Sequence, residues 1–193
     1  MKQMLIRSPY LVEKNPSLDG NPANLQSDIS PFKIDFLDRD GFKLFTSNLS
    51  GNIGGWEEVC ITGYFSETAR KDFESILQMK RTLTIICPEF PVGSNRDRKN
   101  LEALTKLAQA GADIRVNNRL HARFLVAYHP GQERLSGILL LGSFDFNTEC
   151  IGLERHDAGV LICNPDLISK ARELFDQIWE ESEPPTHNGY TVW

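Results

Sequence analysis

The order of short apolar runs along the chain restricts its fold more than any other sequence feature. Between residues 57 and 116, β-branched and apolar segments of strand length alternate with segments whose apolar residues recur at helical spacing. Two further strand-like runs then follow each other without a helix between them, and a third precedes a final helix. Strands that first alternate with helices and then stand next to one another predict an α/β sandwich, in which helices flank a mixed β-sheet.

The strands of this sheet are predicted from short β-branched and apolar runs that end near turn-forming residues. They are expected at residues 59–65, 82–87, 112–116, 120–128, 137–141 and 158–163. The segment from Phe32 to Leu49 contains a probable turn, Asp38-Arg39-Asp40-Gly41, and its structure is not predicted.

Three helices are predicted from apolar stripes and from residues that start or stop a helix. The first begins at Ser66-Glu67, the second is closed by Gly111, and the third is capped by Asn164 with Pro165 at its first position. The residues expected to face the core are, in chain order, Ala69, Phe73, Ile76 and Leu77, then Leu101, Leu104, Leu107 and Ala108, then Leu167, Ala171, Leu174, Phe175 and Ile178.

A length of 193 residues suits one domain, because a second core would leave each half small. We expect a core at residues 31–183, an irregular N-terminal arm at residues 1–30 and an extended tail at residues 184–193. Residues 1–10 lack the apolar run of a signal peptide, and no stretch reaches the ~20 apolar residues that span a bilayer. The four cysteines lie in or beside apolar runs, without zinc-site spacing. A cytoplasmic protein with reduced, buried cysteines and no membrane contact is predicted.

Positive charge is concentrated in one part of the sequence. Residues 96–123 hold seven Lys or Arg and three acidic residues, although the formal charge of the whole chain is −5. Local positive charge on an acidic protein suits the binding of a phosphate at one site better than the wrapping of a long duplex. Alternatively, the basic residues at 96–99 are only the solvated start of a helix.

The residues best suited to chemistry stand at the ends of predicted strands. His121 and Arg123 are two positions apart in one predicted strand, so they share a face, and imidazole and guanidinium can converge on one oxyanion. The next strand ends in Gly142-Ser143, which offers a small hydroxyl and backbone N–H groups at the mouth of the strand. Asp157 precedes the last strand and could orient a histidine.

The order of these residues resembles the phospholipase D superfamily. Its signature is His-x-Lys on one strand, Gly-Ser-x-Asn at the end of the next strand, and an acidic residue before an apolar strand. The resemblance runs from about residue 57 to residue 179 and is greatest for short nucleases with a single motif. It implies that His121 is the nucleophile, that Ser143 contacts phosphate and that Asp157 holds the histidine, without metal or cofactor. Substrate contacts are also expected from Arg115, Arg119, Gly142 and Asn147.

Three positions depart from the superfamily pattern. Arg123 replaces the lysine, Asp145 replaces the asparagine, and Tyr128 stands where longer motifs have an aspartate. Arginine keeps the positive charge but is longer than lysine. Asp145 replaces a possible N–H donor by a negatively charged acceptor near the phosphate. Loss of one transition-state donor costs about 10²–10³ in rate, and misplacement should cost less, so slow turnover is compatible with this sequence.

The resemblance implies a metal-independent phosphodiesterase, a nuclease with a phosphohistidine intermediate. The reaction needs a nucleophile and a separate general acid on opposite sides of phosphorus, yet the chain has one His-x-Lys-like element. A symmetric homodimer is therefore expected to provide the second histidine. In the alternative arrangement, a monomer uses His129 or His156 as the acid, whereas His187 looks non-catalytic.

The sequence is compatible with two other functions. A catalytically degenerate domain of this superfamily could bind nucleic acid or a protein partner without turnover. Cleavage of a lipid headgroup is less favoured, because the sequence has no membrane-binding amphipathic stretch.

Overall fold

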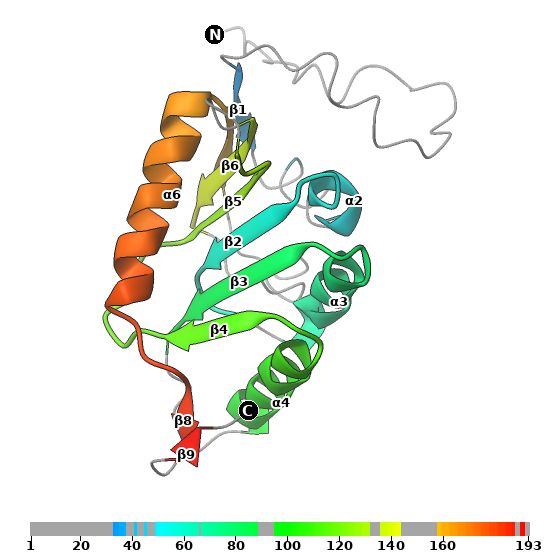
Figure 1. The fold of residues 1–193 in the computed structure, drawn as a ribbon, viewed down its shortest axis with the longest axis vertical. Coiled ribbons are helices and arrows are strands. Elements are labelled where there is room, and N and C mark those ends of the chain that lie inside the picture. Colours follow the sequence, from blue (N-terminus) through cyan, green and yellow to red (C-terminus); the bar gives the residue numbers. More distant parts are fainter. Residues whose placement is uncertain are drawn as a thin grey trace, which may run out of the picture.

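Seven strands form the central sheet of the computed structural model (Figure 1). The structure describes residues 33–37, 41, 45, 49–65, 67–88, 95–131, 136–143, 158–187 and 190–191. The strands are β1 (Lys33–Leu37), β2 (Glu58–Thr62), β3 (Thr82–Cys87), β4 (Asp113–Val116), β5 (Phe124–Tyr128), β6 (Gly137–Gly142) and β7 (Gly159–Cys163). Their order across the sheet is β1-β7-β6-β5-β2-β3-β4.

The sheet is mixed, as the sequence predicted. β2, β3 and β4 are parallel to one another, and β5 pairs in antiparallel fashion with both β2 and β6. β7 pairs in antiparallel fashion with β6 and β1. As a result, β5 and β7 run against the other five strands, and their starts lie where the others end.

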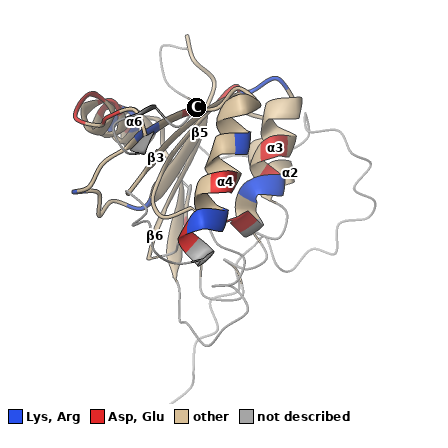
Figure 2. Ribbon diagram, turned by 90° about the horizontal axis from the view of Figure 1, so that it is seen from below, with Lys and Arg blue, Asp and Glu red and all other residues tan. Residues whose placement is uncertain are grey.

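Helices cover both faces of the sheet. They are α2 (Leu49–Ile53), α3 (Arg70–Gln78), α4 (Asn95–Gln109) and α6 (Pro165–Glu180), and a 3₁₀ turn at Glu67–Ala69 precedes α3. α6 lies alone on one face, and α2, α3 and α4 lie on the other (Figures 1 and 2). A small hairpin, β8 (Thr186–His187) and β9 (Tyr190–Thr191), follows α6. No described helix combines the length and the apolar character needed to cross a membrane.

Alternating side chains of the strands fill two apolar layers. Val59 and Ile61 of β2 point to the layer under α2, α3 and α4, whereas Cys60 points to the layer under α6. Every residue of β5 is buried, because its two faces contribute to the two layers and both its edges are paired. This strand is the centre of the core.

Two of the predicted helix boundaries are confirmed by backbone contacts. The side chain of Asn164 accepts hydrogen bonds from the backbone N–H groups of Asp166 and Leu167, both at 3.0 Å, and caps α6. Gly111 has a φ of +106° and lies in the turn that ends α4, where its N–H donates to the carbonyl oxygen of Ala108. At the start of α3, Ala69 occupies the N-cap position without a side-chain bond. The 3₁₀ turn instead leads into this helix; Ser66 lies outside the described residues.

The apolar face of α6 differs from the predicted one. Ile168, Ala171 and Phe175 are buried, whereas Leu167 and Leu174 are 37% and 45% exposed. The helix is rotated because two large side chains also face the sheet: the guanidinium of Arg172 lies over the Tyr128 ring, and Trp179 stacks on Phe175. Their packing turns the two leucines toward solvent.

The described cysteines are buried and outside any disulfide bond, as predicted. Burial raises the pKa of the Cys60 thiol to about 11 and that of Cys87 to about 12. Thiols with raised pKa values carry little thiolate at neutral pH and are poor nucleophiles. Cys60 and Cys87 therefore act as small apolar residues of the core; Cys163 is also buried, and Cys150 lies outside the described residues.

The rotation of α6 can be tested by two neighbouring alanine substitutions. Phe175→Ala should lower the free energy of unfolding by about 3–5 kcal/mol, because it removes a buried ring that contacts Phe124 and Trp179. Leu174→Ala, the matched control, should cost less than about 1 kcal/mol, because this side chain is largely exposed. Urea denaturation of both variants measures the difference. Equal losses would show that the face of α6 is assigned incorrectly.

Candidate active site

The predicted catalytic segments meet at one edge of the sheet. Arg123 precedes β5, Ser143 follows β6, and Ala158 precedes β7. Antiparallel pairing brings these points together, because Phe124 stands opposite Leu141 and Gly142 stands opposite Gly159. The ends of β2, β3 and β4 lie at the same edge, as do the carboxyl ends of parallel strands in many ligand sites.

Hydrogen bonds connect the three segments directly. The Nη1 atom of Arg123 donates to the carbonyl oxygen of Ser143 at 2.7 Å. The backbone N–H of Ser143 donates to the carbonyl oxygen of Ala158 at 3.2 Å, and the N–H of Ala158 lies 3.4 Å from the Ser143 hydroxyl oxygen, which accepts from it. The cation of Arg123 and the hydroxyl of Ser143 are thus held at neighbouring positions on an exposed edge.

His121 does not lie in a strand, contrary to the prediction that residues 120–128 are extended throughout. β5 begins at Phe124, whose N–H donates to Thr62 Oγ1 at 3.1 Å. Beyond this point β5 has no partner in β2, because β2 ends at Thr62 and the backbone bends at Gly63, whose φ is +144°. His121 and Arg123 therefore lie in the segment that leads into β5, and the strand geometry expected to align them is absent.

The imidazole of His121 is exposed at this edge. No described residue forms a hydrogen bond or ion pair with it. An exposed imidazole is accessible to a substrate, but its orientation would need a partner from outside the described residues or from the substrate itself.

Three of the predicted site residues, Asp145, Asn147 and Asp157, lie outside the described residues. Asp157 immediately precedes Ala158, whose backbone bonds to Ser143. Gly142 is half-buried at the end of β6, and its N–H lies 3.4 Å from the carbonyl oxygen of Arg123. The roles assigned to these residues stay predictions.

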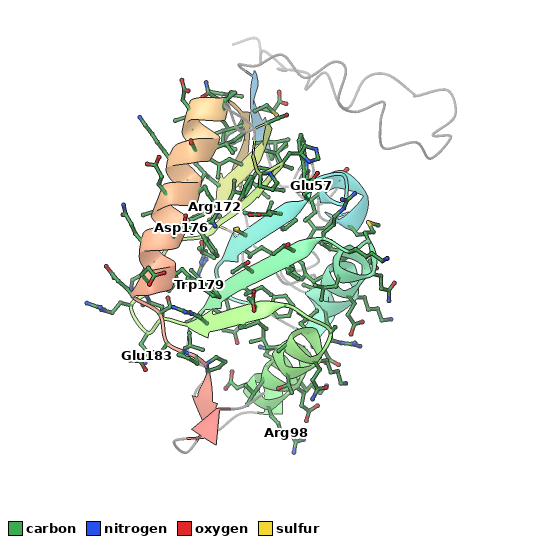
Figure 3. All side chains as sticks on the ribbon, viewed as in Figure 1. Glu57, Arg98, Arg172, Asp176, Trp179 and Glu183 are labelled. Carbon is green, nitrogen blue, oxygen red and sulfur yellow. The ribbon has the colours of Figure 1, made fainter. Side chains whose placement is uncertain are left out.

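Tyr128, the residue in place of an aspartate, lies at the opposite edge of the sheet. Its hydroxyl contacts the Glu58 carboxylate and Arg172, and Arg172 pairs with Asp176 (Figure 3). Burial and the bond to Glu58 raise the pKa of Tyr128, so the phenol stays protonated at neutral pH. Tyr128 therefore contributes to the packing of α6, and its hydroxyl lies away from the candidate site.

His129 also lies at the edge away from the candidate site. Its Nδ1 atom is 3.4 Å from the Glu57 carboxylate, and its ring packs on Trp56 with centroids 4.9 Å apart. The residues between it and His121 include all five of β5, which span about 16 Å. His129 therefore cannot share a phosphate with His121 of the same chain in this fold.

Arg115 connects β4 to the C-terminal end of α6. Its Nη1 atom donates to the carbonyl oxygen of Trp179 at 2.8 Å and lies 3.4 Å from that of Ser182, and its guanidinium lies 4.5 Å from the centre of the Trp179 ring. A cation at the C-terminus of a helix also offsets the helix dipole. Arg115 thus has a structural role, and its role in substrate binding stays a prediction.

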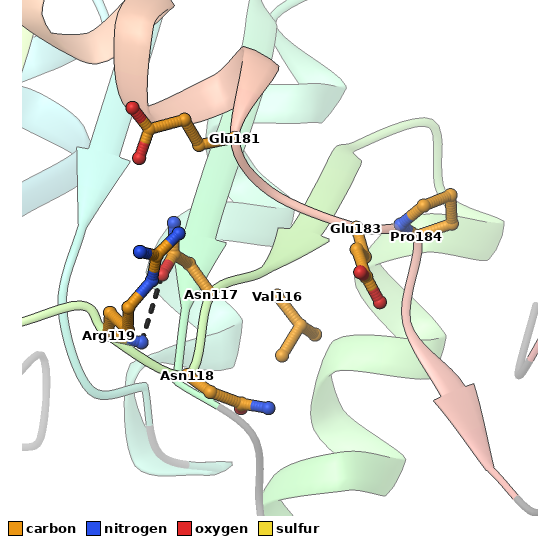
Figure 4. A pocket seen from close by; sticks show the side chains of 7 residues that line it. All are labelled: Val116, Asn117, Asn118, Arg119, Glu181, Glu183 and Pro184. Carbon is orange, nitrogen blue, oxygen red and sulfur yellow. Dashed lines mark hydrogen bonds between the residues drawn. The ribbon is translucent and has the colours of Figure 1, made fainter.

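A pocket of about 200 Å³ opens beside this connection (Figure 4). Its walls come from Val116 at the end of β4, from residues 117–119 after it, and from Glu181, Glu183 and Pro184, which follow α6. The sequence predicted Arg119 as a substrate-binding residue. It did not predict Glu181 or Glu183, because both are far from Arg119 in the sequence and follow the end of α6.

Positive charge near the candidate site comes from individual exposed arginines. Basic and acidic residues are interleaved along α3 and α4, so no continuous basic stripe covers these helices (Figure 2). Arg119 and Arg123 are exposed near the edge that carries His121. In the described part of the chain, no group of three or more His, Cys, Asp or Glu side chains is arranged to hold a metal ion.

Comparison with solved structures identifies the fold. The chain is similar to Nuc from Salmonella typhimurium, a phospholipase D family member, with 14% identity, a TM-score of 0.60 and coverage of 79% of this chain and 97% of Nuc. NucT from Helicobacter pylori matches with 14% identity, a TM-score of 0.60 and coverage of 78% and 98%.

TrmBL2, an archaeal chromatin protein whose structure shows a mode of DNA binding, matches with 14% identity, a TM-score of 0.55 and coverage of 83% and 57%. No family model and no curated protein matches the sequence. At these identities the comparisons concern the fold alone, and the predicted phospholipase D-like fold is confirmed.

The structural role of Arg115 leads to a stability test. Arg115→Ala should lower the free energy of unfolding by about 1.5–3 kcal/mol, because it removes hydrogen bonds from a charged group to the end of α6. Arg119→Ala, an exposed arginine nearby, should change it by less than about 0.5 kcal/mol. Chemical denaturation would measure both values. An unchanged stability of the Arg115 variant would show that the contact does not hold α6.

Proposed function

We propose that the chain is a phosphodiesterase that cleaves nucleic acid without a metal ion, through His121 at the edge of the sheet. The observation that carries this proposal is the hydrogen-bonded chain from Arg123 to Ser143 to Ala158. These bonds hold a cation and a hydroxyl close to the segment that carries an exposed histidine. A nucleophile, a cation and a hydroxyl are the groups that the proposed in-line attack on a phosphodiester uses. The fold that the chain shares with Nuc supports the same reaction class.

In the proposed reaction, a nitrogen of His121 attacks phosphorus and forms a phosphohistidine. The bond to the leaving oxygen breaks, and that oxygen takes a proton from a second histidine. The second imidazole then accepts a proton from water, whose oxygen attacks phosphorus and releases His121 and the product. Arg123 offsets the growing negative charge on the phosphoryl oxygens, and Ser143 contacts one of them.

Residues around this pair have supporting roles in the proposal. Asp157 holds the imidazole of His121, and Asp145, Asn147 and Gly142 complete the wall of the site beside Ser143. Arg119 contributes positive charge for the flanking phosphate, and its exposed side chain can reach such a group. Arg115 supports this segment through its contacts with α6.

The second histidine in the proposal is His121 of another copy of the chain. An isologous dimer brings two identical edges face to face, so each phosphate meets a histidine from each copy. The position of His129 supports this arrangement, because it lies at the far end of β5 and is occupied by Glu57 and Trp56. The monomer alternative would then depend on His156.

Binding without turnover is the second candidate function. Arg123 bonds to the Ser143 carbonyl in the structure, so the cation is engaged by the protein at the place where the superfamily pattern has a lysine. The similarity to a chromatin protein with a mode of DNA binding shows that the same fold occurs in a DNA-binding protein. Such a domain would bind oligonucleotides and leave them intact.

Assays in EDTA separate these functions. The protein should hydrolyse a generic bis-phosphodiester and single-stranded DNA, because His121 itself provides the nucleophile and needs no metal-activated water. Phosphatidylcholine should remain intact. His121→Ala should lower the rate at least 10³-fold, since it removes the nucleophile. Activity that vanishes with chelator and returns with magnesium would contradict the proposal, and binding without any product would support the second candidate.

Mixing active and inactive chains tests the composite site. When wild type is mixed and re-equilibrated with His121→Ala, activity should fall as the square of the wild-type fraction, because mixed dimers lack one of the two histidines. Mixing with His129→Gln, a histidine control at the opposite edge, should leave activity unchanged. A linear fall, or sedimentation as a monomer of 21.8 kDa, would exclude the shared site.

A further inference from the structure

The pocket between β4 and α6 has a fixed framework. Val116 and Glu183 exchange two backbone hydrogen bonds, of 2.8 and 2.9 Å, which hold the chain after α6 against the end of β4. The buried Asn117 donates from its side chain to Ser182 Oγ at 3.3 Å and accepts from the N–H of Arg119 at 2.9 Å. The walls are thus positioned before any ligand arrives.

Polar groups of opposite charge line this pocket. Figure 4 shows Glu181 and Arg119 on one side and Glu183 with Pro184 on the other, above Asn118. No ion pair between Arg119 and either glutamate occurs in the part of the chain that the structure describes. The pocket therefore presents two exposed carboxylates and one guanidinium that are available to a ligand.

The pocket is next to the candidate nucleophile along the chain. Arg119, at its rim, is two residues before His121, so their Cα atoms are at most about 7 Å apart, close to the length of one nucleotide. A strand whose phosphate lies at His121 would place its neighbouring base at the pocket. A volume of about 200 Å³ corresponds to roughly six or seven water molecules, enough for one ring system but too small for a longer group.

We propose that this pocket holds the base next to the cleaved phosphate and selects bases that carry an exocyclic amino group. This inference rests on the nucleic-acid substrate proposed above. The Glu181 and Glu183 carboxylates are acceptors only, so they accept from the amino group of cytosine, guanine or adenine and repel the carbonyl oxygen at the corresponding position of uracil.

The same carboxylates repel phosphate, so the backbone of the strand stays at the rim. There, Arg119 pairs with the phosphate, and only the base enters. Binding affinity then has two parts: a salt-dependent part from the arginines that is equal for all sequences, and a base-dependent part from the glutamates.

Oligo(dC) and oligo(dU) of equal length test the proposal, because they carry the same charge and differ in the amino or carbonyl group of the base. Binding is measured by fluorescence anisotropy at constant salt, in EDTA, with the His121→Ala chain so that no cleavage interferes. Oligo(dC) should bind about tenfold more tightly than oligo(dU), the effect of one well-placed hydrogen-bonded pair. Glu181→Gln and Glu183→Gln, made in this background, should bring the ratio close to one.

Glu180→Gln provides the matched control, since Glu180 is exposed at the end of α6 and does not line the pocket. It should retain the tenfold preference. Equal binding of the two oligonucleotides, or a preference that survives both pocket substitutions, would overturn the inference. A preference without cleavage by the wild-type protein would refute the proposed catalysis and leave the pocket assignment intact. Cleavage of a generic bis-phosphodiester without oligonucleotide binding would refute the pocket assignment alone.

Discussion

The candidate site lies where it does because β5, which is buried on both faces, pairs in antiparallel fashion with the strands on both its edges. All five of its residues are buried, and its neighbours β2 and β6 both run against it. The strand therefore starts at the edge where its neighbours end. Arg123, just before this start, therefore comes to lie beside Ser143, just after the end of β6, and His121 lies two residues before Arg123. A parallel orientation of the same strand would place them at the opposite edge of the sheet, where β2 starts at Glu58.

A second set of contacts, at the same edge, joins β4 and the residue after it to the end of α6. Arg115 lies in β4 and Asn117 directly follows this strand, whereas Trp179 lies in the last turn of α6 and Ser182 follows that helix. Their hydrogen bonds hold α6 across the end of β4. The position of the segment before β5 therefore depends on residues that sequence order places far from it, and loss of this contact would be felt at the candidate site as well as in the core.

Features that depend on neighbouring residues could be predicted from the sequence, and features that depend on distant contacts could not. The Asn164 cap and the reversal at Gly111 follow from local chemistry. The start of β5 was predicted too early, because it depends on where its distant partner β2 ends, at the bend of Gly63. The pocket was missed because its two walls follow different elements: Arg115 and Ser182, which join them, are 67 residues apart. The approach of Arg123 to Ser143 was inferred from motif order and is observed, whereas the role of His121 beside them stays a prediction.

The pairing of β1 with β7 has a consequence for the order in which the molecule can form. β2, β3 and β4 are linked by short helical crossovers and can associate while the chain is still being synthesised. β1 precedes them all, yet its partner is the last strand of the sheet, so a long loop must close before the pair contributes any stability. A ribosome-bound chain would therefore keep β1 unpaired, in need of protection from aggregation, until β7 had left the exit tunnel.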